Sequence, residues 1–230
     1  MPFYYLFDPT MLIVLPALIF TIWAQHNVNS TYEKYSKVTV SRHMTGYDSA
    51  RRILDANGLQ DVRIERVHGH LTDHYDPRAN VIRLSDSVHD STSAAAIGVA
   101  AHEAGHAVQH AVGYTPIKIR MSIIPITKIG SAMSMPLFIL GLFLALPELM
   151  YVGIAFYSLA LLFQLVTLPV EFNASNRAMA ALDKSGMLSD SELRASRKVL
   201  TAAALTYVAA LASSLLSLLR LLVIANNRKR

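Results

Sequence analysis

The chain has 230 residues, of which 53% are hydrophobic and 16% are charged, and it contains no cysteine. It is long enough for one domain, but this balance is too apolar for a soluble protein of its size, which indicates a membrane protein. Disulfides and thiolate metal sites are excluded, and the net charge of +5 comes from scattered basic residues without an aromatic-interleaved patch, which argues against nucleic-acid binding.

Several apolar runs are long enough, or nearly so, for the roughly 20 residues that cross a bilayer core. They are residues 10–24, 123–146, 149–170 and 199–225. The first run lacks the basic flank and the small-residue cleavage site of a signal peptide, so we interpret it as a retained anchor. The sequence thus predicts a multi-pass protein of the cell (inner) membrane.

The positions of the basic residues predict how the chain is oriented in the membrane. They cluster near the ends of segment 25–122 and within 171–198, which places both segments on the cytoplasmic side if 123–170 forms a two-span hairpin. The basic C-terminal tail opposes this if the last helix spans fully, and both alternatives stay open. We therefore divide the chain into an anchor (1–24), a zincin-like portion (25–122), the transmembrane hairpin (123–170), a third-ligand helix segment (171–198) and a C-terminal membrane helix with its basic tail (199–230).

Segment 25–122 begins with an amphipathic pattern. Residues 46–59 predict a helix that ends at Gly58. Residues 61–67 and 80–85 alternate as strands do, and a turn at Asp76-Pro77 would join them into a small hairpin. Residues 89–116 then predict one helix, capped by Asp90, Ser91 or Ser93.

That second helix carries the stretch "AAHEAGHAVQH" (100–110). His102 and His106 lie one helical turn apart, so both can reach one ion, whereas Glu103 is offset by one residue and can hold a water instead. The alternative is an alanine-rich helix whose histidines make ordinary polar contacts.

A zinc enzyme of this kind needs a third protein ligand. Glu171 follows the third apolar run, where Pro169 suits a helix start, and Ser175 lies four residues on, where it could orient a histidine through its second ring nitrogen. Without the histidine pair, Glu171 would be an ordinary interfacial residue. Further candidates to orient a ligand or to assist at the oxyanion are Arg177, His74 and Tyr75.

The strand before the zinc helix is a candidate for substrate binding. Val81, Ile82 and Arg83 precede the helix as the substrate-binding edge strand does in zincins, so an extended peptide could pair with them by strand addition. The alternative is that this strand only closes the hairpin over the core.

The order of motifs resembles a known family. "HEAGH", followed after two apolar spans by "EFNASNRA", resembles the gluzincin membrane peptidases related to HtpX and the CAAX prenyl protease, and nearly the full chain resembles the YugP-type neutral zinc metallopeptidase family. The resemblance implies Zn²⁺ held by His102, His106 and Glu171, with Glu103 as general base. One departure is Ser175, where HtpX-like proteins have a carboxylate four residues after the ligand glutamate.

These observations predict a mainly α, multi-pass membrane protein whose zincin-like catalytic portion has a zinc helix and a small β-hairpin or sheet. Its partners would be the lipid bilayer and a protein or peptide substrate, itself membrane-associated, with no nucleic acid and no indicated oligomeric state. We expect a zinc-dependent endopeptidase. A non-catalytic zinc-binding scaffold is the alternative; a site-2-type intramembrane protease is less favoured, because the chain has no Asp-Gly pair.

Overall fold

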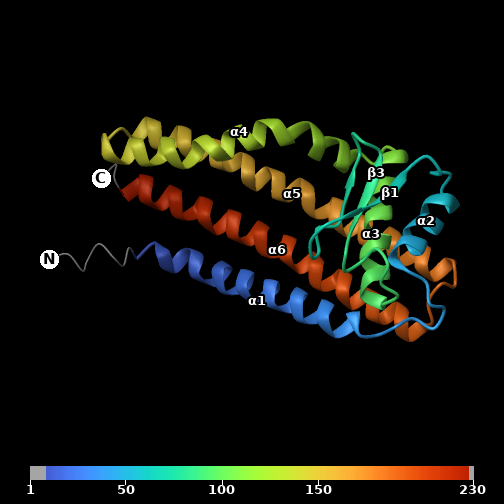
Figure 1. Ribbon diagram of the computed structural model, residues 1–230. Coiled ribbons are helices and arrows are strands. Elements are labelled where there is room, and N and C mark those ends of the chain that lie inside the picture. The colour runs from blue at the N-terminus through green and yellow to red at the C-terminus, as the bar shows by residue number, and fades with distance from the viewer. Residues whose placement is uncertain (1–8, 228–230) are drawn as a thin grey trace. The chain divides into compact units, whose positions relative to one another are not determined.

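The computed structural model describes residues 9–227, which form mainly helices and one small sheet (Figure 1). The helices are α1 (Met11–Ser36), α2 (Gly46–Ala56), α3 (Ala94–Ala111), α4 (Thr115–Phe143), α5 (Pro147–Lys184) and α6 (Asp190–Asn227). The strands are β1 (Arg63–Val67), β2 (His74–Asp76) and β3 (Val81–Ser85). The predicted mainly α fold class is confirmed.

The contacts divide the chain into two compact units, each assembled from separated segments. Within the described residues, unit 1 contains 9–24, 119–168 and 206–227, and unit 2 contains Gln25–Lys118 and Pro169–Leu205. Unit 2 thus contains most of residues 25–122 and all of residues 171–198. The last three residues of the predicted basic tail, 228–230, lie outside the described residues.

Unit 1 contains apolar parts of α1, α4, α5 and α6, and each of these helices is long and apolar enough to cross a membrane. Within it, α4 and α5 pack closely, since a Cβ on Gly153 would lie 2.7 Å from the backbone nitrogen of Phe138. Many large apolar side chains remain exposed, such as Ile129 at 65% and Phe143 at 83%. Such a surface is stable in lipid rather than in water, which accounts for the apolar composition.

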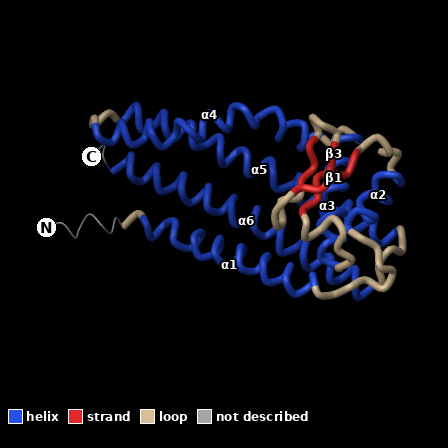
Figure 2. The backbone as a smooth tube through the Cα atoms, viewed as in Figure 1, coloured by secondary structure: helices blue, strands red, loops and turns tan. Residues whose placement is uncertain are grey.

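Unit 2 contains the three-stranded sheet, whose strands are red in Figure 2. The strand order is β1-β3-β2. β1 pairs with β3 in parallel, and β2 pairs with β3 in antiparallel. The predicted hairpin between 61–67 and 80–85 is therefore wrong, because β2 forms the hairpin with β3. The predicted edge strand is also wrong: Val81, Ile82 and Arg83 lie in the central strand, whose backbone groups already bond to neighbours on both sides.

Burial explains why β3 is central. Val81, Ile82 and Leu84 are all 0% exposed. Val81 lies on one face of the strand and Ile82 and Leu84 lie on the other, so apolar side chains are buried on both faces, although Arg83 interrupts the apolar run.

The helices α2 and α3 begin as the sequence predicts, but α3 ends at Ala111 and does not continue to residue 116. The side chains of Thr45 and Asp48 form a capping box at the start of α2, and Ser93 caps α3 by accepting a hydrogen bond from the backbone of Ala96. One expectation fails: Pro169 does not start a helix, because α5 runs without interruption from Pro147 to Lys184.

Candidate metal centre

Two histidines project from the same face of α3. His102 and His106 are four residues apart, and their ring centroids lie 4.6 Å from each other. Most of α3 is buried on all sides, but the side chain of His102 keeps 15% of its surface exposed. The pair therefore lies at the rim of the core, where a small ligand can reach it.

The third side chain comes from α5, which packs closely against α3 at Gly105. A Cβ on Gly105 would lie only 2.6 Å from the carbonyl oxygen of Ala174, so glycine permits the approach. Glu171, one turn before Ala174, is 2% exposed. Its Oε2 lies 3.3 Å from Nε2 of His102 and 3.5 Å from Nε2 of His106.

Polar side chains hold both histidine rings from behind. Nδ1 of His102 lies 3.1 Å from Oγ of Ser175, and Nδ1 of His106 lies 3.0 Å from Oε1 of Gln109. The amide nitrogen of Gln109 donates to the carbonyl oxygen of Val170 (2.8 Å) and to Oδ1 of Asn173 (2.9 Å).

This network fixes a tautomer. The carbonyl of Val170 can only accept, so the Gln109 amide nitrogen faces it and the Gln109 oxygen faces His106. Nδ1 of His106 must then carry a proton, so in the neutral ring the Nε2 lone pair is directed at the side where Glu171 lies. Metal-bound histidines are usually held in this way.

The three donors fit a tetrahedral ion. The ligand atoms of His102, His106 and Glu171 all lie within 4.8 Å of one another. Bonds of 2.0–2.2 Å to a tetrahedral zinc ion would separate two ligand atoms by about 3.4 Å, close to the separations between the Glu171 oxygen and the two imidazole nitrogens. Two imidazoles and a carboxylate are also a donor set that zinc accepts, so this cluster can hold the ion.

The local charge also favours a cation. Burial lowers the pKa of His106, but its hydrogen bond to Glu171 and the charge of Glu103 outweigh burial, so the pKa is raised above its ordinary value. The same field that favours a protonated imidazole favours a divalent ion at this place.

Glu103 lies beside this cluster. Its side chain is largely buried, at 8% exposure, and among the described residues no side chain or backbone group forms a hydrogen bond with its carboxylate. A buried carboxylate without a protein donor needs water or a ligand as its partner.

A second carboxylate lies within electrostatic reach of Glu103. Asp73 accepts hydrogen bonds from the backbone nitrogen (2.7 Å) and from Oγ (2.9 Å) of Ser85. Burial raises the pKa of Asp73, these hydrogen bonds lower it, and the negative charge of Glu103 raises it further. The resulting net shift is upward.

The remaining candidates from the sequence make other contacts. Nε of Arg177 donates to Asn173, Nδ1 of His74 lies 2.9 Å from the carbonyl oxygen of Thr72, and the hydroxyl of Tyr75 donates to Asn80. Arg177 thus joins the network behind His106, whereas His74 has its partner beside β2 and the ring of Tyr75 lies 6.1 Å from the ring of His110 on α3.

Two residues of the site are missing from the sequence-based prediction. Gln109 could have been found, because it lies three residues after His106 and therefore on the same side of the helix. Asp73 gives no local signal, since its place depends on how the segment before β2 folds against β3.

Comparisons with known proteins agree with this geometry. The profile of a family described as "Putative neutral zinc metallopeptidase" matches residues 10–226. The chain is 48% identical over 215 residues to a Bacillus subtilis (strain 168) protein named "Putative membrane protease YugP", and the match covers 94% of this chain and 96% of that protein. A comparison with solved structures gives no match. The matched range includes all three residues of the metal cluster.

Proposed function

Because the chain belongs to the neutral zinc metallopeptidase family, we propose that it is a membrane-embedded endopeptidase whose zinc ion is held by His102, His106 and Glu171. The observation that carries the proposal is the convergence of these side chains from two helices, beside a carboxylate that forms no hydrogen bond with any other described residue. A purely structural zinc site would leave that buried carboxylate without a role.

Peptide hydrolysis requires an activated water and a base. When bound, zinc supplies the Lewis acid that acidifies water and polarises the scissile carbonyl. Glu103 accepts the proton of the attacking water and then donates it to the nitrogen of the leaving amine. Ser175 and Gln109 keep the two imidazoles oriented toward the ion.

We further propose that the catalytic unit faces the cytoplasm and that the substrates are membrane-associated or misfolded proteins. Basic residues near the ends of the polar segments support this orientation, among them Lys37 and Arg42. Since the chain has no native cysteine, a single Lys37→Cys variant gives one thiol. A membrane-impermeant maleimide should label it in inverted vesicles and not in intact cells, and the reverse pattern would refute the orientation.

The metal site is tested by zinc content per chain in detergent-purified wild type, His106→Ala and Glu171→Ala, with folding checked by circular dichroism. We expect near-stoichiometric zinc in the wild type and a large loss in both folded variants. Retention of zinc without Glu171 would mean that another group is the third ligand.

The catalytic role is tested separately with Glu103→Gln. This variant should keep its fold and its zinc but lose cleavage of an unfolded protein substrate such as casein, because glutamine cannot accept the proton. Asp86→Asn, an exposed aspartate in a surface ion pair with Arg66, is the matched control and should cleave as the wild type does. Equal cleavage by Glu103→Gln would favour the scaffold alternative.

A further inference from the structure

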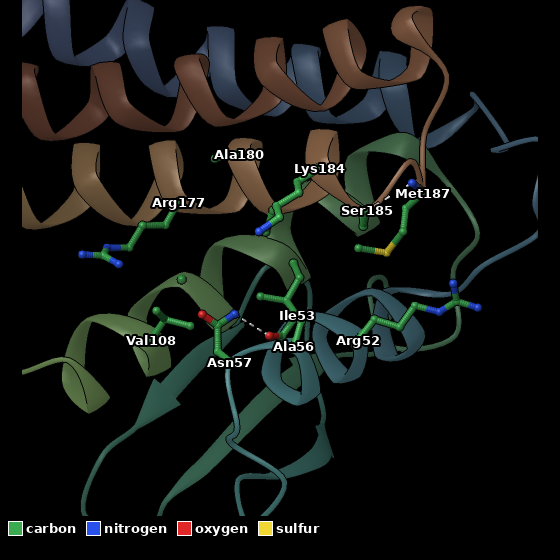
Figure 3. A pocket seen from close by; sticks show the side chains of 12 residues that line it. Arg52, Ile53, Ala56, Asn57, Val108, Arg177, Ala180, Lys184, Ser185 and Met187 are labelled. Carbon is green, nitrogen blue, oxygen red and sulfur yellow. Dashed lines mark hydrogen bonds between the residues drawn. The ribbon is translucent and has the colours of Figure 1, made fainter.

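Unit 2 contains a groove that the peptidase chemistry does not use. It has a volume of about 450 Å³ and lies between α2, α3 and the end of α5 (Figure 3). Ile53 of α2, Val108 of α3 and Met187, which follows α5, line it with largely buried apolar surface. A space of this size is in the range of specific binding sites.

The ionisable side chains that line the groove are all cations. They are Arg52, Arg177 and Lys184. In Figure 3 the Lys184 ammonium extends from α5 toward α2 and α3, whereas the guanidinium groups of Arg177 and Arg52 lie toward opposite ends. The nearby acid Asp55 is already paired with Arg51 at 2.8 Å. The groove thus combines an apolar lining with positive charges spread along its length.

The groove lies on the same two helices as the metal centre. Gly105 and Val108 of α3 line it, and His106 is their neighbour in sequence. Arg177 belongs to both places: it lines the groove, and its Nε donates at 2.8 Å to Asn173, which also accepts from Gln109 behind His106. A chain held in the groove would therefore lie about one helix diameter, roughly 10 Å, from the ligands.

We propose that this groove is a docking site for an acidic, apolar peptide segment of the protein substrate, apart from the bond that is cleaved. Three cations at separate positions match several carboxylates along an extended chain better than they match the single compact charge of one headgroup. The apolar lining matches side chains between those carboxylates. The role of the groove in substrate binding rests on the proposed peptidase function, but binding of an acidic peptide to the groove does not require catalysis.

The test measures binding to Glu103→Gln protein in neutral detergent, so the result does not depend on cleavage. A fluorescein-labelled peptide of alternating glutamate and leucine is the probe, and the same peptide with glutamine for glutamate is its control. Fluorescence anisotropy should show binding of the acidic peptide that weakens as salt is raised. Adding Arg52→Gln and Lys184→Gln should lower its affinity about tenfold, the effect of losing two partly exposed ion pairs.

A charge-matched control carries Lys37→Gln and Arg42→Gln, two exposed cations that do not line the groove, and it should bind as the parent does. Zinc content and circular dichroism confirm that each variant is folded. Equal affinity for the acidic and neutral peptides, or equal losses in the groove and control variants, would overturn the proposal. Displacement of the acidic peptide by short-chain phosphatidylglycerol at lower concentration than by unlabelled peptide would assign the groove to a lipid headgroup and overturn it as well.

Discussion

At the scale of single residues, the orientation of the imidazole rings depends on two neutral side chains. A carboxylate behind a histidine would raise the basicity of the ring, whereas Ser175 and Gln109 orient the rings by hydrogen bonds without adding charge. The negative charge near the ion therefore comes from Glu171 and Glu103.

Removing these hydrogen bonds should weaken zinc binding without removing a ligand. We expect Ser175→Ala and Gln109→Leu each to lower zinc affinity by about 10- to 100-fold, the usual effect of losing such a partner. Competition with a chromophoric chelator measures the change. Asn176→Ala, the exposed neighbour of Ser175, is the control and should bind zinc as the wild type does. An unchanged affinity in both test variants would mean that the rings are held by packing alone.

Asp73 should give the stability of the metal-free protein a characteristic pH dependence. Burial raises its pKa above the ordinary 3.8. The ionised form is thus less favourable in the folded chain, and this cost appears as the pH rises above 3.8 through the folded pKa and persists at neutral pH. Asp73→Asn lacks this cost, so its melting temperature should rise relative to wild type between about pH 4 and 7. A difference that is constant with pH would contradict the assignment.

At the scale of elements, the close packing of α3 and α5 determines the metal site. Gly105→Ala should push α5 away, because its Cβ would lie 2.6 Å from the backbone oxygen of Ala174. We expect a loss of about 1–3 kcal/mol in the free energy of unfolding, together with weaker zinc binding, since Glu171 moves with α5.

Gly98→Ala provides the comparison for this effect. Gly98 is also on α3, but its Cβ would lie 3.1 Å from the side chain of Ser196 on α6. This variant should lose stability with little change in zinc affinity. If both variants bind zinc equally well, the Gly105 contact does not position Glu171. Thermal denaturation and chelator competition together separate the two quantities.

The helices could be predicted from the sequence, and the sheet pairing could not. Apolar periodicity and local capping residues such as Thr45 and Ser93 indicate where α2 and α3 begin. The parallel pairing of β1 with β3 depends on β2, whose three residues are too few for a clear pattern. Likewise, proline is favoured in the first turn of a helix and disfavoured in its interior, so the sequence around Pro169 predicts a helix start at a place where α5 instead continues.

The metal cluster could be predicted in part. The spacing of His102 and His106 predicts that both side chains lie on one face of a helix, because a helix completes about one turn in that interval. Glu171 lies 69 residues from His102 in the sequence, so its place in the cluster depends on tertiary packing. Its position after the third apolar run makes it a candidate, and the family resemblance implies it as a ligand. The place of Asp73 near Glu103 depends on the fold alone.

At the scale of the whole molecule, zinc would join segments that lie far apart in sequence. The metal-bound folded state should therefore be stabilised by mass action, by about 4 kcal/mol when free zinc is a thousandfold above its dissociation constant. Removal of zinc with a chelator should lower the melting temperature, measured by intrinsic fluorescence. His106→Ala should melt at the same temperature with or without chelator; a chelator effect in that variant would place the stabilising metal elsewhere.

The central position of β3 limits how a substrate backbone can bind to the sheet. Within the described residues the edge strands of this sheet are β1 and β2, and of the two it is β2 that packs against α3, which carries the histidines. Because β2 is three residues long, it offers an added strand about two backbone hydrogen bonds. Two backbone hydrogen bonds contribute little affinity, and they do not distinguish one substrate side chain from another. An enzyme that binds the substrate backbone this weakly would select its substrates through contacts away from the cleaved bond. It would tolerate many different sequences at the bond itself.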